Sequence, residues 1–124
     1  MGNSEFDNGP DASKIGLVYM NDPIISKFLK ETQPVRSRIK KIYFFGSRVK
    51  GTARPDSDYD LLLVVSEDFS LGDKDKLYDI VMDVLLETGR LLSLKIFKEN
   101  VFLRLREMGT PFMNHVLTEG ISIG

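Results

Sequence analysis

The chain has 124 residues, of which 42% are hydrophobic and 28% charged, a composition that indicates one soluble globular domain. Its 17 basic and 18 acidic residues leave a formal net charge of −1, so a broad basic surface for nucleic acid is not expected. The absence of Cys excludes disulfides and thiolate metal sites. No apolar run is long enough to cross a bilayer and no signal peptide is recognisable, which predicts a cytoplasmic protein.

The first predicted helix follows a segment with few large apolar residues. Residues 1–14 are rich in Asn, Asp, Gly and Ser, which predicts a flexible terminus and leaves residues 15–124 as a single domain. Asn21-Asp22-Pro23 is typical of a helix start. Apolar residues then recur at helical spacing, and Pro34 should end or kink the helix. These apolar residues are Ile24, Ile25, Phe28 and Leu29.

Two apolar runs predict strands. Residues 40–45 are β-branched and aromatic, and Gly46 ends the run. Residues 58–65 carry a continuous aliphatic run, which is typical of a strand buried on both faces. Between the strands, we expect residues 46–51 to turn and to open a short helix. Residues 52–57 should form a loop.

The second half of the chain predicts a long helix. Asp73 is the expected cap, and Gly89 should end the helix. Apolar residues recur at i, i+3, i+4, i+7 and i+8, which defines one buried face. They are Leu77, Ile80, Val81, Val84 and Leu85.

A third strand is predicted over residues 90–97, with Ser93 and Lys95 on one face. Residues 101–108 should form a short helix, and Thr110-Pro111 should begin a last one that Gly120 ends. This order of elements predicts a small α/β or α+β domain, with one short mixed sheet and helices mainly on one of its faces.

Asp58 and Asp60 form an acidic pair at the start of the second predicted strand. Residues two apart on a strand share a face and are separated by about 7 Å. Two carboxylates on one face repel each other unless a cation lies between them, and Mg²⁺ binds such oxygen ligands together with substrate phosphates. An alternative is that both acids are ordinary turn or strand-edge polar residues. Asp is unfavourable in strands, yet Asp60 directly precedes five aliphatic residues of the predicted strand. This break with local propensity favours a functional role for Asp60.

Gly46 and Ser47 lie between the first strand and the expected short helix. Backbone N–H groups and a hydroxyl at such a place can hold a phosphate, and Gly allows a ligand to approach the backbone. The alternative is an ordinary turn in which Ser47 caps the helix. Basic side chains in the same connection could neutralise phosphate charge; they are Arg48, Lys50 and Arg54.

Gly46-Ser47, ten intervening residues and Asp58-Tyr59-Asp60 together resemble the signature of the nucleotidyltransferases of the DNA polymerase beta superfamily. The resemblance is closest to the minimal nucleotidyltransferases, and the surrounding order of helices and strands is also similar. It implies the palm-like fold of polymerase beta, with ATP as the expected nucleotide. In this interpretation Gly46 and Ser47 hold the triphosphate with the help of Arg48 and Lys50.

The resemblance also implies that Asp58 and Asp60 are catalytic and bind Mg²⁺. An acceptor hydroxyl would attack the α-phosphorus, and pyrophosphate would leave. The family usually has a third carboxylate on the next strand, but here the corresponding polar residues are Ser93 and Lys95. Lys95 would place a positive charge in the site and compete with one metal ion. Either one metal ion supports slow transfer, or the domain binds the nucleotide without turning it over.

Three functions therefore remain open at the level of sequence. The first is Mg²⁺-dependent transfer of a nucleoside monophosphate to a hydroxyl of a protein or small molecule. The second, which the resemblance implies, is a nucleotide-binding antitoxin that partners a helical HEPN protein. The third is a degenerate domain with a structural role. The small size leaves little room for an acceptor-binding domain, so we expect a partner or a homo-oligomer to choose the acceptor.

Overall fold

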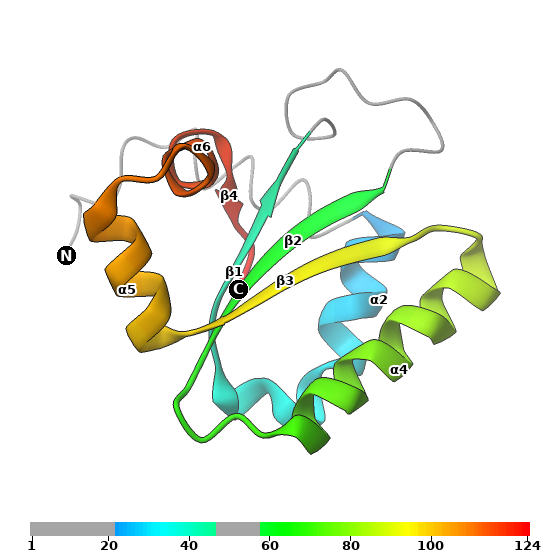
Figure 1. Ribbon diagram of the computed structural model, residues 1–124. Coiled ribbons are helices and arrows are strands. Elements are labelled where there is room, and N and C mark those ends of the chain that lie inside the picture. Colours follow the sequence, from blue (N-terminus) through cyan, green and yellow to red (C-terminus); the bar gives the residue numbers. More distant parts are fainter. Residues whose placement is uncertain (1–21, 47–57) are drawn as a thin grey trace, which may run out of the picture.

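The computed structural model describes residues 22–46 and 58–124, and these residues form a mixed sheet with helices on both faces (Figure 1). The strand order is β3-β2-β1-β4. β1 runs antiparallel to β2 and β4, whereas β2 and β3 run parallel. The strands are β1 (Ile39–Phe45), β2 (Tyr59–Val65), β3 (Leu92–Lys98) and β4 (Ile121–Ser122). The predicted mixed sheet is confirmed, with β4 as an additional short strand.

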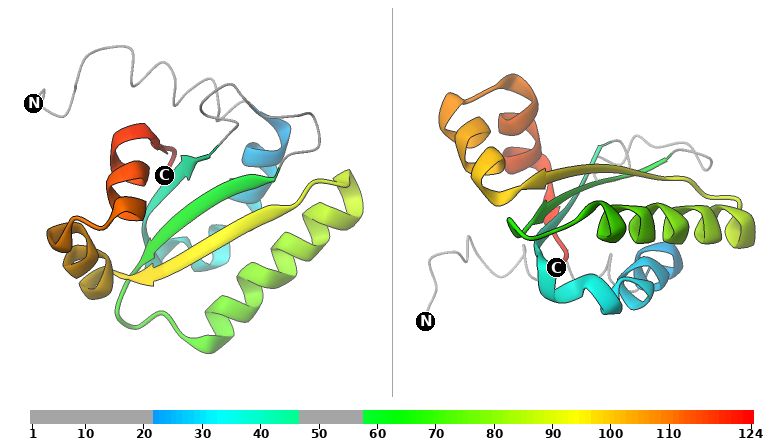
Figure 2. Two further views of the ribbon diagram at one scale, coloured as in Figure 1. Left: turned by 45° about the horizontal axis from the view of Figure 1, so that its top comes forward. Right: turned by 60° about the horizontal axis from the view of Figure 1, so that its bottom comes forward.

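Two pairs of helices cover the two faces of the sheet. Figure 2 shows α2 and α4 on one face and α5 and α6 on the other. A short 3₁₀ helix, η2 (Gln33–Arg38), joins α2 to β1 and contains Pro34, so the first helix ends before this proline, as predicted. The helices are α2 (Pro23–Glu31), α4 (Leu71–Thr88), α5 (Glu99–Met108) and α6 (Pro111–Glu119).

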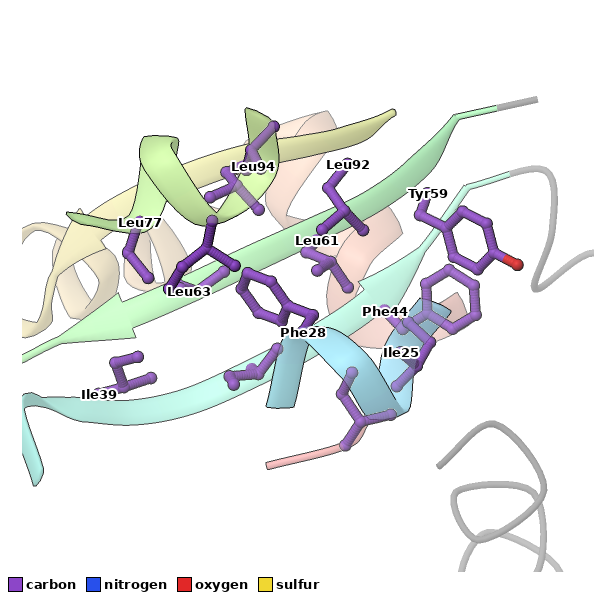
Figure 3. Packing of buried hydrophobic residues seen from close by; sticks show 14 of the residues in the cluster. Ile25, Phe28, Ile39, Phe44, Tyr59, Leu61, Leu63, Leu77, Leu92 and Leu94 are labelled. Carbon is purple, nitrogen blue, oxygen red and sulfur yellow. The ribbon is translucent and has the colours of Figure 1, made fainter. Parts of the chain in front are cut away.

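The larger hydrophobic core lies between the sheet and the α2 and α4 helices (Figure 3). Alternate residues of β2 point into it, and α2 and α4 contribute the apolar stripes that their sequences predicted. The α/β class is confirmed, but helices cover both faces of the sheet and not mainly one. Central members of the core are Ile25, Phe28, Phe44, Leu61, Leu63, Leu77 and Leu92.

A smaller core occupies part of the opposite face, beneath α5 and α6. It consists of Phe45, Leu62, Val64, Phe102, Met113 and Val116. Asp60 and Ser93 belong to the same face by strand alternation but lie outside this cluster. The α5 and α6 helices thus cover one part of the face and leave polar strand residues beside it.

The helix ends show how local chemistry sets the element boundaries. Asp22 Oδ1 accepts hydrogen bonds from the backbone N–H groups of Ile24 (2.8 Å) and Ile25 (3.3 Å), so the predicted start of the first helix is confirmed. Thr110 caps α6 in the same way. Gly89 ends α4 at a φ of 74°, in the left-handed conformation that Gly adopts without strain.

The predicted cap of the long helix was wrong. Ser70 is the N-cap, and Asp73 is the third helical residue, whose side chain accepts from the Ser70 backbone N–H at 2.9 Å. Ser70 Oγ accepts from the Asp73 N–H in return, at 3.1 Å, which completes a capping box. The third strand begins at Leu92, two residues later than predicted.

Several predictions fall outside the described residues. These are the flexible terminus over residues 1–14, the short helix after Gly46, the loop over residues 52–57, and the side chains of Ser47, Arg48, Lys50 and Arg54. In the described part of the chain, no helix is both long and apolar enough to cross a membrane.

Candidate functional site

Gly46 and Asp60 are brought together where β1 ends and β2 begins. Phe45 and Asp60 are register partners in the antiparallel pair, and Gly46 follows Phe45 directly. Gly46 has a φ of 91°, and a Cβ atom added to it would lie 2.3 Å from Asp60 Oδ2. A side chain at this position would therefore collide with the carboxylate. Both the backbone conformation and the close approach require Gly.

Asp58 and Asp60 flank Tyr59 at the start of β2. Asp58 immediately precedes the strand and is exposed, whereas Asp60 is partly buried within it. Tyr59 points to the opposite face, as predicted, where it is buried and stacks on Phe44 with ring centroids 5.7 Å apart. The sheet thus separates the acidic side of this segment from the larger hydrophobic core.

Burial and the neighbouring Asp58 oppose the ionisation of Asp60, and Lys95 favours it. Burial raises the pKa of the Asp60 carboxyl above its ordinary value, the negative charge of Asp58 raises it further, and the positive charge of Lys95 lowers it. A carboxylate whose ionisation is opposed by burial and by a neighbouring acid is a favourable place for a cation. Asp58 and Asp60 offer oxygen donors of the kind that a divalent ion such as Mg²⁺ takes.

The β3 strand completes the polar surface beside Asp60. Ser93 is the register partner of Asp60, and Lys95 is the partner of Leu62. Since residues two apart share a face, Ser93 and Lys95 both lie on the Asp60 side of the sheet. Residues 22–46 and 58–124 contain no group of three or more His, Asp or Glu side chains that could hold a metal ion. The β3 strand itself, Leu92–Lys98, carries no acidic residue.

The two nearest acids in sequence do not replace the absent carboxylate. Glu87 lies on α4, across the sheet from Asp60, and its Oε1 is 2.9 Å from Lys27 Nζ. Glu99 begins α5 after the far end of β3, whose last residue pairs with Val65. Neither acid is therefore placed to serve as a third ligand beside Asp60.

The start of β2 is tied to the start of α2 by a side-chain hydrogen bond. The Tyr59 hydroxyl donates to Asp22 Oδ2 at 2.9 Å. The other oxygen of the same carboxylate caps α2. Tyr59 lies between the two acids, so this bond helps to hold their backbone in place. Sequence reasoning did not identify Asp22 as part of this arrangement, because the two residues are 37 apart in the chain.

An exposed aromatic side chain from α6 also borders the site. Phe112 packs edge-on against Phe45, with centroids 5.7 Å apart and an interplanar angle of 82°. Its side chain is 39% exposed. His115 lies further along α6, is exposed, and has its Nε2 atom 3.3 Å from Glu119 Oε1. It is remote from the acidic pair in its contacts, as expected.

A cavity of about 360 Å³ lies at the other end of the sheet. It is bounded by the ends of β2 and β3 and by the first turn of α4, far along both strands from Asp60 and Ser93. Among the described residues, no carboxylate lines this cavity, so the acidic pair is the better candidate for a catalytic site. The cavity is lined by Val65, Phe69, Ser70, Leu71, Lys74, Ile96 and Lys98.

The comparisons with known proteins agree with this geometry. The polymerase beta nucleotidyltransferase family matches residues 25–124. A Methanocaldococcus jannaschii protein named "Putative protein adenylyltransferase MJ0604" is 34% identical over 85 residues, which are 68% of this chain and 78% of that protein. A second protein of the same organism, "Putative protein adenylyltransferase MJ0141", is 27% identical over 101 residues, 81% of this chain and 95% of that protein.

A solved structure has a similar fold. One chain in the crystal structure of a toxin-antitoxin with AMP-PNP superimposes with a TM-score of 0.51, and the match covers 84% of this chain and 73% of that one. At 20% identity, this likeness concerns the fold alone. The family match extends over both halves of the sheet and over the acidic pair. The chain therefore belongs to the polymerase beta nucleotidyltransferase family, as its signature predicted, and is a nucleotidyltransferase of the minimal type.

Proposed function

We propose that this protein transfers AMP from ATP to a hydroxyl group of a protein or small-molecule acceptor. One observation carries the proposal: the Asp60 carboxylate lies beside a glycine, Gly46, that has room for no side chain, and a second acid, Asp58, directly precedes the same strand. Such a place suits a metal-bound triphosphate, because the acids bind the cation and Gly46 lets phosphate approach the backbone. The names of the two M. jannaschii relatives support adenylyl transfer.

The reaction exchanges one phosphorus–oxygen bond for another. The acceptor oxygen bonds to the α-phosphorus and loses its proton, while the bond between the α-phosphorus and the bridging oxygen of the β-phosphate breaks. Pyrophosphate leaves with that electron pair. Mg²⁺, when bound, neutralises charge on the phosphate oxygens. Asp58 and Asp60 would hold the ion, and the triphosphate would be held by Gly46, Ser47, Arg48 and Lys50.

Label transfer from ATP tests this proposal. The protein is incubated with Mg²⁺, α-labelled ATP and a lysate of its source, and labelled acceptors are then separated. We expect labelling by the wild type and none by the Asp58→Asn/Asp60→Asn double variant. An Asp75→Asn/Asp79→Asn variant, which removes two exposed acids from α4, is the matched control and should label normally. Full transfer by the Asp58→Asn/Asp60→Asn variant would refute the proposal.

The α5 and α6 helices offer a surface on which a protein acceptor could bind. They carry exposed apolar side chains on or next to the sheet face that holds Asp60. Phe112 contacts Phe45, the register partner of Asp60, so a partner bound over Phe112 would lie near the acidic pair. We propose a cytoplasmic helical partner of the HEPN type, in line with the toxin-antitoxin structure that shares this fold. The exposed side chains are Val101, Leu103, Met108 and Phe112.

A second candidate function is binding without turnover. It is favoured by one observation, the presence of Ser93 and not an acid beside Asp60. In this case the protein would hold ATP and the helical partner as an antitoxin, and co-purification with the partner would survive loss of both acids. If label transfer is absent while this co-purification persists, binding alone is the function.

A further inference from the structure

Among the residues that the structure describes, Lys95 is the positive side chain on the polar face around Asp60, where a further ligand for a metal ion would be expected. Neighbouring strands lie about 4.8 Å apart, and residues two apart along a strand about 6.6 Å apart. Ser93 is therefore the immediate neighbour of Asp60, and Lys95 is its diagonal neighbour on the same face. A lysine side chain can span that diagonal with its four methylene groups.

The charge balance of this surface suits one cation and opposes two. Two-metal sites place their cations about 3.5–4 Å apart, and carboxylates between them offset the strong mutual repulsion. Here the described residues supply two carboxylates, Asp58 and Asp60, together with the Lys95 ammonium. The Ser93 hydroxyl is neutral and offsets none of the repulsion. A second cation next to Lys95 would meet a positive charge in place of a ligand.

The exposure of Lys95 allows its side chain to reach the acidic pair. Its ammonium group can turn toward bound phosphate or toward Asp60. No other basic residue on β3 shares this position, because Lys98 lies at the far end of the strand, beside Val65.

We propose that this site binds one divalent cation per nucleotide, between Asp58 and Asp60, and that the Lys95 ammonium supplies the positive charge that a second cation would otherwise provide. The inference rests on the proposed function, since it assumes that the acidic pair binds a metal–nucleotide complex. It adds that Ser93 and Lys95 determine the number of metal ions. Lys95 would stabilise negative charge on the nucleotide phosphates beside Asp60. Unlike a second metal ion, its ammonium group needs no protein ligands.

Counting bound metal tests the inference without any need for turnover. The protein is dialysed to equilibrium against Mn²⁺, used as a probe for Mg²⁺, and a non-hydrolysable ATP analogue, and bound Mn²⁺ and nucleotide are both measured. We expect one Mn²⁺ per bound nucleotide in the wild type. The Ser93→Asp/Lys95→Ser variant, which adds an acid in register with Asp60 and removes the ammonium, should bind two. Lys98→Ser is the matched control and should bind one.

The outcomes separate this inference from the proposed function. Two Mn²⁺ per nucleotide in the wild type would overturn the inference even if AMP transfer is observed. One Mn²⁺ in a wild type that transfers no label would uphold the inference and overturn the proposed transfer. If Ser93→Asp/Lys95→Ser still binds only one Mn²⁺ while circular dichroism shows that it is folded, Ser93 and Lys95 do not set the metal count and the inference fails. No Mn²⁺-dependent nucleotide binding would overturn both.

Discussion

Gly46 and Asp60 are in such close contact that an added Cβ at Gly46 would lie 2.3 Å from Asp60 Oδ2. In Gly46→Ala, either the carboxylate moves or the backbone leaves its φ of 91°. We expect AMP transfer to fall about 100-fold, since displacing a catalytic group by an ångström can have that effect. The free energy of unfolding should fall by about 1 kcal/mol, because Ala is strained at a positive φ. Activity assays and urea unfolding measure the two effects.

The matched control for this variant is Gly72→Ala. Gly72 lies in the first turn of α4, where an added Cβ would approach only Ser70 Oγ, at an ordinary 3.6 Å. Ala is favoured over Gly in a helix by about 1 kcal/mol, so this variant should be slightly more stable than the wild type and fully active. Wild-type activity in Gly46→Ala would show that the close contact with Asp60 does not matter for function.

The Tyr59 hydroxyl joins the acidic segment to the start of α2 by a hydrogen bond. Removal of this hydroxyl should lower the stability of the fold. Tyr59→Phe keeps the ring stacked on Phe44 but loses the 2.9 Å bond to Asp22 Oδ2. Hydrogen bonds to charged groups contribute roughly 1.5–3 kcal/mol, so we expect a loss of about 2 kcal/mol in the free energy of unfolding. A double-mutant cycle with Asp22→Ala isolates the interaction. Additive losses in this cycle would mean that the bond contributes nothing to stability.

Asp60 should make the metal-free protein less stable as the pH rises. Burial and the charge of Asp58 raise the pKa of Asp60 above its ordinary value of 3.8, so the folded state binds its proton more readily than the unfolded state does. The free energy of unfolding therefore falls as pH rises from about 3.8 through the folded-state pKa. Asp60→Asn removes this effect, so it should exceed the wild type in stability at pH 7, with a smaller advantage at lower pH.

Urea unfolding of both proteins in the presence of a chelator, from pH 4 to 7, measures this difference. Asp79→Asn, at an exposed position on α4, controls for the loss of one negative charge. The side-chain carbon signal of Asp60 in NMR gives a second readout: Asp58→Asn should lower the pKa of Asp60, and Lys95→Met should raise it. A stability difference that does not change with pH would contradict the role assigned to burial.

Sequence periodicity predicted most of this fold because the patterns extend over many residues. The α4 stripe, from Leu77 to Leu85, repeats over more than two helical turns, and the β2 run is long enough to predict burial on both faces. The β4 strand was missed because it has two residues, too few for any period, and is held by main-chain pairing with Tyr43 and Phe44. Pairing of this kind depends on backbone geometry and leaves no mark in the side chains.

The site was partly predictable for a related reason. Alternation along a strand places Ser93 and Lys95 on one face, but the register that makes Ser93 the neighbour of Asp60 is a tertiary property. The same is true of Asp22, whose local signal indicated only a helix cap, whereas its second oxygen accepts from Tyr59. The contact between Phe112 on α6 and Phe45 on β1 is tertiary as well, and it leaves the Phe112 ring partly exposed.

The capping box of α4 provides a test of the corrected helix start. Ser70 Oγ and the Asp73 carboxylate each accept a backbone hydrogen bond from the other residue, so both substitutions should cost stability. We expect Ser70→Ala to lose about 1 kcal/mol, and Ser70→Gly only a few tenths, because Gly leaves the cap accessible to water. Thermal unfolding resolves this order, since about 1 kcal/mol corresponds to roughly 4 °C in a domain of this size. If Asp73→Ala is costly and Ser70→Ala is neutral, Asp73 is the true cap, and the helix begins where the sequence pattern alone had placed it.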